Sequence, residues 1–218
     1  MENVAGMVRG KMRLVFVACL HELKASGYRV SARVLDAMYF GVPQHRQRLI
    51  VIGVRDDLAP EPSHPVAVTW PIPLRTALAA AALVGDQEND AQTPVLSDVY
   101  GQLWPHVRPG QRAIDVVGKG FSSCIKPHLD RPSPTLTKTQ TGRGFATIVH
   151  PAEQPALSIR EAAMIGSYPP AFRFSGSYQE QWARIGNGVP PLLMRAIAEH
   201  LRAIVLDGVV RPSSVGSA

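Results

Sequence analysis

The 218-residue sequence predicts an α/β fold that is interrupted by a subdomain of different character. Three observations support this prediction. A helical pattern and two strand patterns follow one another within the first 55 residues, prolines cluster between Pro60 and Pro73, and capped helices return from Ser158 onward. Because 45% of the residues are hydrophobic and only 18% are charged, a disordered chain is excluded and a sizeable core is expected.

The first third of the chain contains one predicted helix and two predicted strands. Apolar residues recur at helical spacing over residues 11–26, where Ser26-Gly27 provides a stop. Residues 28–34 alternate between apolar and polar types, which indicates a half-buried strand. After a loop, the β-branched run 48–54 indicates a strand buried on both faces. This part is therefore interpreted as the tail of an α/β sheet.

The rest of the chain contains further helix signals. Residues 74–84 form an alanine-rich helical candidate. Ser158 with Glu161, and Ser177 with Glu180, have the capping-box spacing that begins a helix. Residues 186–191 indicate a turn into a last helix, with a proline near its first position. The predicted buried stripe of that helix consists of Leu193, Ile197, His200, Leu201 and Ile204.

Composition restricts the cellular setting and the partners. The formal net charge of +6 favours a polyanionic partner. The two cysteines form neither a disulfide framework nor a zinc site, so a reducing cytoplasm is expected. The seven histidines show no metal-ligand spacing, and we expect no metal. The sequence contains no apolar run long enough for a membrane helix and no basic segment typical of a secretion signal.

Three polar side chains are expected at the mouth of the buried strand. Gln44, Arg46 and Arg48 are spaced by two residues, so extended geometry would place them on one face. Ligands of open α/β sheets bind at strand ends, which makes these residues a candidate binding site. The alternative is a solvated sheet edge whose arginines oppose aggregation.

Five segments resemble, in their order along the chain, the C-terminal half of DNA cytosine-5 methyltransferases. They are Glu2-Asn-Val4, Gln44-His-Arg-Gln-Arg48, Arg131-Pro-Ser-Pro-Thr-Leu-Thr137, Arg160-Glu-Ala-Ala163 and Gly186-Asn-Gly-Val-Pro-Pro191. The resemblance extends over nearly the whole chain apart from about residues 56–103. It implies the C-terminal part of a Rossmann-like, S-adenosylmethionine-dependent methyltransferase sheet, interrupted by a small target-recognition subdomain.

The resemblance also implies roles for individual residues. Glu2 matches the acid that hydrogen-bonds a flipped-out cytosine, and Arg48 matches the arginine that contacts the carbonyl oxygen of that base. Arg46 matches the arginine that braces the active-site loop and a phosphate. The turn that packs against the methyl donor corresponds to Gly186, Asn187 and Val189. The implied contacts to double-stranded DNA are Gln44, Arg112, Arg131, Thr135 and Arg143. A disordered terminus for Glu2 and a simple helix-entry turn for Asn187 remain as alternatives.

The resemblance divides the chain into four expected segments. Residues 1–55 form the C-terminal part of a catalytic α/β domain, and residues 56–157 form a DNA-binding target-recognition region. Residues 158–207 are the closing helices, and residues 208–218 are a flexible tail.

Two parts of a complete enzyme are absent from the sequence. No glycine-rich donor loop follows a first strand, and no Pro-Cys dipeptide is present. Cys19 and Cys124 lie in no nucleophile context, so neither is assigned to catalysis. We therefore expect the isolated chain to be inactive, with the main S-adenosylmethionine site on a missing N-terminal portion. One interpretation is a split-enzyme subunit that a complementing N-terminal chain completes. The alternative is a non-catalytic DNA-binding remnant of a restriction-modification locus.

Overall fold

The computed structural model describes residues 1–84, 93, 102, 104–117, 124–138, 148–151 and 156–207. The chain forms two compact units. Unit 1 comprises residues 1–36, 47–68 and 193–218, and unit 2 comprises residues 37–46 and 69–192. These units are defined by compactness, and the four functional segments expected from the sequence stay a prediction. In the described part of the chain, no helix is long and apolar enough to cross a membrane.

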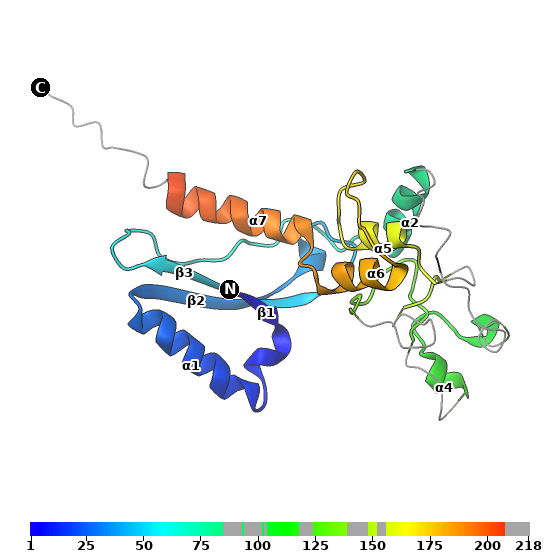
Figure 1. Ribbon diagram of the computed structural model, residues 1–218, viewed down its shortest axis with the longest axis horizontal. Helices are drawn as coiled ribbons and strands as arrows, with labels where there is room; N and C mark the ends of the chain where they lie inside the picture. The colour runs from blue at the N-terminus through cyan, green and yellow to red at the C-terminus, as the bar shows by residue number, and fades with distance from the viewer. Residues whose placement is uncertain are drawn as a thin grey trace, which may run out of the picture. The chain divides into compact units, whose positions relative to one another are not determined.

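Unit 1 is built on a three-stranded antiparallel sheet of order β1-β3-β2 (Figure 1). Its strands are β1 (Glu2–Val4), β2 (Tyr28–Asp36) and β3 (Gln47–Arg55). The two strands expected from the sequence are thus joined by a third at the N-terminus. β3 lies in the centre, and its residues 49–52 are at most 4% exposed. The prediction that this strand is buried on both faces is confirmed.

Helices cover both faces of the sheet in unit 1 (Figure 1). The 3-10 helix η1 (Ala5–Val8) leads into α1 (Met12–Ala25), which packs its inner face against Leu49 and Val51. On the other face, α7 (Pro191–Leu201) lies near Ile50 and Ile52, and its own residue Ile197 is buried. A π-helical turn, η5 (Arg202–Leu206), follows α7.

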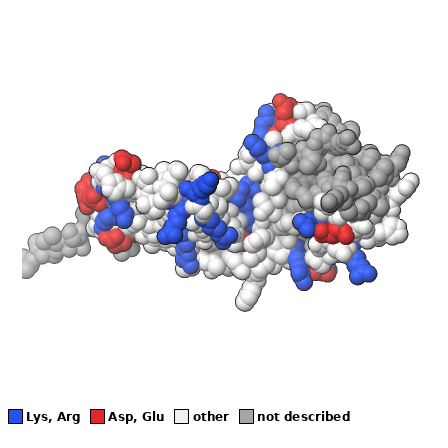
Figure 2. All heavy atoms as spheres, turned by 90° about the horizontal axis from the view of Figure 1, so that it is seen from below, with Lys and Arg blue, Asp and Glu red and all other residues white. Residues whose placement is uncertain are grey.

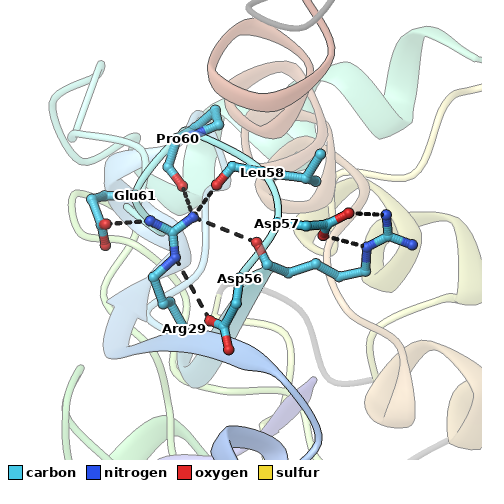
Figure 3. A network of polar contacts seen from close by, with 7 residues as sticks. Arg29, Asp56, Asp57, Leu58, Pro60 and Glu61 are labelled. Atoms are coloured by element: carbon cyan, nitrogen blue, oxygen red, sulfur yellow. Dashed lines mark hydrogen bonds and ion pairs between the residues drawn. The ribbon is translucent and has the colours of Figure 1, made fainter.

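Arg29 on β2 fixes the segment that leaves β3 (Figure 3). Its guanidinium donates to the carbonyl oxygens of Leu58 and Pro60 and forms an ion pair with Glu61. Asp56 lies 3.8 Å from Arg29 Nε, which adds a second carboxylate to the network. Because one side chain holds several backbone groups, the turn after β3 has a defined conformation.

Unit 2 is mainly helical. Its described elements are η2 (Ala37–Tyr39), α2 (Leu74–Leu83), η4 (Trp104–His106), α4 (Ala113–Val117), α5 (Ile159–Ile165) and α6 (Tyr178–Asn187). Its main core joins α2, α5 and α6 around Trp182, which is 1% exposed. A smaller cluster surrounds Trp104. Both predicted capping boxes are present, at Ser158 and at Ser177.

Two expectations differ in detail from the structure. Alternation along β2 predicted inward-facing Ala32 and Val34, but both are exposed because β2 is an edge strand with one neighbour. Gly186 and Asn187, expected in a turn, form the last residues of α6, and the turn begins at Gly188. The expected tail, residues 208–218, lies outside the described residues.

Candidate functional site

Glu2 and Arg48 form an ion pair between two strands of unit 1. Arg48 Nε lies 2.9 Å from Glu2 Oε1, and the antiparallel register places Val4 opposite Arg48. The side chains are 12% exposed for Arg48 and 34% for Glu2, so the pair is shielded but reachable from solvent. Burial lowers the pKa of the Arg48 guanidinium from its ordinary value, while Glu2 acts in the opposite direction. The terminus that carries Glu2 is therefore ordered as a strand.

The Glu2–Arg48 pair retains unused hydrogen-bonding capacity. Arg48 Nη1 donates to the backbone oxygen of Gln47 at 2.7 Å, and Arg48 Nε forms the ion pair with Glu2 Oε1. Within the described ranges, Arg48 Nη2 and Glu2 Oε2 have no hydrogen-bond partner. The pair thus keeps one donor and one acceptor, which suits a planar ligand with a matching acceptor and donor on one edge.

Arg46 is the centre of a buried network in unit 2. Its side chain is 1% exposed and donates to the backbone oxygens of Leu136, Gly186 and Gly188 at 2.7–2.8 Å. Gln44, 2% exposed, accepts a longer bond of 3.4 Å from Arg46 Nη1. A charged donor satisfying three carbonyl groups away from water is a strong interaction. Arg46 therefore ties three distant segments of the chain together.

The end of α6 and the turn after it are packed too tightly for additional atoms. A Cβ on Gly186 would lie 2.5 Å from the backbone of Thr137, and a Cβ on Gly188 would lie 2.0 Å from Tyr168 Oη. Trp182 Nε1 also donates to the Thr137 carbonyl at 2.9 Å. The predicted motifs at residues 131–137 and 186–191 are thus in direct contact, and both glycines are needed for close approach.

The structure places the remaining predicted site residues in unit 2. Asn187 is exposed at the end of α6, and Val189 is half-buried in the following turn. Thr135 Oγ1 donates to the His45 carbonyl at 2.6 Å, and Arg131 is exposed. Arg112 is exposed and paired with Asp115. Arg143 lies outside the described residues. Gln44 is buried beside Arg46 and is not at the surface of its unit.

Sequence reasoning missed Tyr168 and Ser167. Tyr168 packs against Phe172 and Phe174, with ring centroids 5.3 and 5.0 Å apart, and its hydroxyl faces Gly188. Burial raises the pKa of Tyr168 from its ordinary value. Ser167 adopts a φ of 62°, rare for a residue other than glycine, and its Oγ accepts from Leu192 N at 3.3 Å. Pro169 and Pro170, which follow Tyr168, are typical of a helix end and give no signal for these contacts.

The comparisons with known proteins agree with these motifs. A family model for C-5 cytosine-specific DNA methylases matches residues 1–203 of the chain. The chain belongs to this family. Among the described residues, no group of three or more His, Cys, Asp or Glu side chains is placed to hold a metal ion.

Two of the relatives are named as type II methyltransferases. The chain is 31% identical to the type II methyltransferase M.AplI of Arthrospira platensis over 97% of its own length. It is 28% identical to M.NgoFVII of Neisseria gonorrhoeae over 94% of its length. In both comparisons it spans 58% of the relative's length.

Solved structures of methyltransferases share the fold. A putative DNA modification methyltransferase encoded within an Escherichia coli prophage aligns with a TM-score of 0.72 and 19% identity. That alignment covers 93% of this chain and 68% of the other. The Entamoeba histolytica methyltransferase EhMeth aligns with a TM-score of 0.61 and 15% identity, over 96% of this chain and 62% of that one. The small sheet with its helices is therefore part of an α/β methyltransferase fold, as predicted.

Proposed function

We propose that this chain is the C-terminal portion of a DNA cytosine-5 methyltransferase, which transfers a methyl group from S-adenosylmethionine to C5 of a flipped-out cytosine in duplex DNA. The Glu2–Arg48 pair carries the proposal. Family membership over residues 1–203 and relatives named as type II methyltransferases support it.

The unused atoms of the pair match one edge of cytosine. The base presents an exocyclic amino donor and a carbonyl acceptor. Arg48 Nη2 donates to the carbonyl oxygen, and Glu2 Oε2 accepts from the ring edge that carries the amino group. Each hydrogen bond to a charged group contributes about 1.5–3 kcal/mol, or roughly 10- to 150-fold in binding or rate. Two such bonds offset much of the few kcal/mol needed to flip the base.

The turn held by Arg46 fits the donor side of such an enzyme. Arg46 and Tyr168 fix the backbone on either side of Asn187, and the Asn187 side chain is left exposed. When bound, S-adenosylmethionine supplies an electrophilic methyl group. In this chain Asn187, with Gly186 and Val189, would pack against the donor, while its main site lies on an N-terminal portion.

The nucleophile must also come from elsewhere. Cys124 is 2% exposed in the small core of unit 2, and Cys19 packs between α1 and the sheet. Cys124 is buried and Cys19 is partly buried against the core, so in this proposal the catalytic cysteine belongs to an N-terminal portion. The isolated chain is accordingly inactive. Duplex DNA is the substrate and is also contacted by the recognition region.

The test is reconstitution with an N-terminal methyltransferase portion, followed by transfer of a tritiated methyl group to duplex DNA. Arg48→Ala should abolish transfer, and Glu2→Gln should reduce it by at least tenfold. Arg55→Ala is the control, because Arg55 is exposed on the same strand and contacts Asp57. Undiminished transfer by the Arg48→Ala mixture would overturn the assignment.

A further inference from the structure

Three cations lie within five residues of one another at the start of α1. Arg9, Lys11 and Arg13, here called the basic cluster, are all exposed. Their side chains form no ion pair or hydrogen bond with any residue that the structure describes. Some other exposed arginines of unit 1 are neutralised, as Arg55 is by Asp57 and Arg195 is by Glu199. The basic cluster is therefore a site of uncompensated positive charge.

The segment that carries the basic cluster contains no acidic residue. No Asp or Glu occurs between residues 3 and 21, and Glu2 itself is paired with Arg48. Figure 2, which views the molecule from the side on which α1 lies, shows a group of Lys and Arg side chains in the middle of the view with hardly any Asp or Glu beside it. Such a surface attracts a polyanion.

The backbone fixes the basic cluster close to the candidate catalytic pair. β1 carries Glu2 and continues directly into η1, and Gly10, at a φ of 55°, makes the turn into α1. Two extended residues, one 3-10 turn and one further peptide span roughly 20 Å at most from Glu2 to Arg9. One turn of B-DNA is about 34 Å long and carries a phosphate charge about every 1.7 Å. A duplex held at Glu2 therefore presents phosphates within reach of the cluster.

We propose that the basic cluster binds the sugar-phosphate backbone of the duplex whose cytosine is held by Glu2 and Arg48. The contact is electrostatic and independent of base sequence, and it positions the duplex relative to β1. This inference rests on the proposed function, because duplex DNA is taken as the substrate.

Salt dependence measures the contact directly. Each phosphate neutralised contributes about 0.9 to the slope of log affinity against log salt concentration. Arg9→Gln/Lys11→Gln/Arg13→Gln should therefore lower that slope by up to about 2.7 and weaken binding equally for duplexes of different sequence. Arg9→Lys/Arg13→Lys should keep the slope, because lysine also binds phosphate as a point charge.

The experiment uses the full 218-residue chain and duplex binding by fluorescence anisotropy over a range of salt concentrations. The control triple variant is Arg55→Gln/Arg195→Gln/Arg202→Gln, which removes the same net charge from exposed side chains of unit 1 that already have acidic partners. It should leave the slope almost unchanged. All six positions are exposed, and circular dichroism checks that the variants fold.

The outcomes separate this inference from the proposed function. A wild-type slope for the Arg9/Lys11/Arg13 variant overturns the basic cluster as a DNA site, whatever the methyl-transfer assay gives. An equal fall for the control overturns it too, because net charge alone would then explain the effect. The inference would also be overturned if the Arg9/Lys11/Arg13 variant lost binding to anionic lipid vesicles but kept its binding to DNA. The cluster would then be a membrane-surface site. If the wild-type chain binds no duplex at all, the result counts against both the proposed function and this inference. If methyl transfer is lost only in Arg48→Ala, the result supports the proposed function alone.

Discussion

Gly188 faces the hydroxyl of Tyr168, and this contact gives a sharp test of the packing around the α6–α7 turn. The Gly188→Ala Cβ would lie 2.0 Å from Tyr168 Oη. The backbone itself accepts alanine, because φ is −65° and ψ is 152°. The ring has little room to retreat, since Phe172 and Phe174 pack against it. Overpacking of this kind costs about 1–3 kcal/mol.

The clash depends on one oxygen atom, so Tyr168→Phe should relieve it. Within the described ranges the Tyr168 hydroxyl has no hydrogen-bond partner, and its removal by itself should change stability little. In the Tyr168→Phe background the next atoms around the new Cβ are the Arg184 carbonyl oxygen at 3.1 Å and the ring carbon Cζ at 3.4 Å. Gly188→Ala should then cost less than in the wild type, because the Arg184 carbonyl oxygen has to give by only a few tenths of an ångström, and the coupling should be about 1–2 kcal/mol.

The assay is urea unfolding followed by tryptophan fluorescence. All three tryptophans lie in unit 2, so the signal reports this unit. Gly166→Ala is the matched control, because its Cβ would contact the Tyr168 ring at 3.1 Å and not the hydroxyl. Its cost should be the same in both backgrounds. If Gly188→Ala costs equal amounts in the wild-type and Tyr168→Phe backgrounds, to within about 0.5 kcal/mol, the steric argument is refuted.

Three further predictions follow from contacts elsewhere. Arg46→Lys should lower the free energy of unfolding of unit 2 by at least about 2 kcal/mol, because an ammonium group cannot replace all three carbonyl contacts. Tryptophan fluorescence in urea measures this change, and a decrease below about 0.5 kcal/mol would contradict the prediction. Burial, with Arg33 and His200 nearby, lowers the pKa of His64 from 6.5, so the unfolded chain binds more protons. Stability should therefore fall as the pH drops below 6.5, and circular dichroism should show a weaker pH dependence for His64→Gln. Arg29→Gln should speed amide exchange and proteolysis over residues 58–61, where unchanged rates would show that the arginine network does not fix the turn.

Local signals in the sequence were sufficient for most individual elements. The capping boxes at Ser158 and Ser177 place both helix starts, because cap and N3 residue are three positions apart and need no tertiary partner. The apolar run of β3 likewise predicts its central position. Burial along β2 could not be read from alternation, since it depends on which strands flank β2 in the sheet.

The candidate site depends on contacts that are distant in sequence. The Glu2–Arg48 pair requires the antiparallel register of β1 on β3, and Arg46 reaches carbonyl groups 90 to 142 residues away. Family motifs identify these residues without giving their contacts. Tyr168 had no motif signal of its own, because its role arises only from the absence of a side chain at Gly188. Gly188 and Tyr168 are 20 positions apart, and nothing in a single sequence indicates that a glycine and a tyrosine at this separation pack against each other.

Arg46 and Arg48 show why residue type alone does not determine role. They lie two positions apart, and spacing predicted one shared polar face. In unit 2, Arg46 is fully enclosed and its donors are directed to backbone oxygens of Leu136, Gly186 and Gly188. In unit 1, Arg48 is held by Glu2 and retains a donor without a partner among the described residues. Substitution of Arg46 should therefore be detected first in stability, and substitution of Arg48 in base binding and methyl transfer while stability changes little.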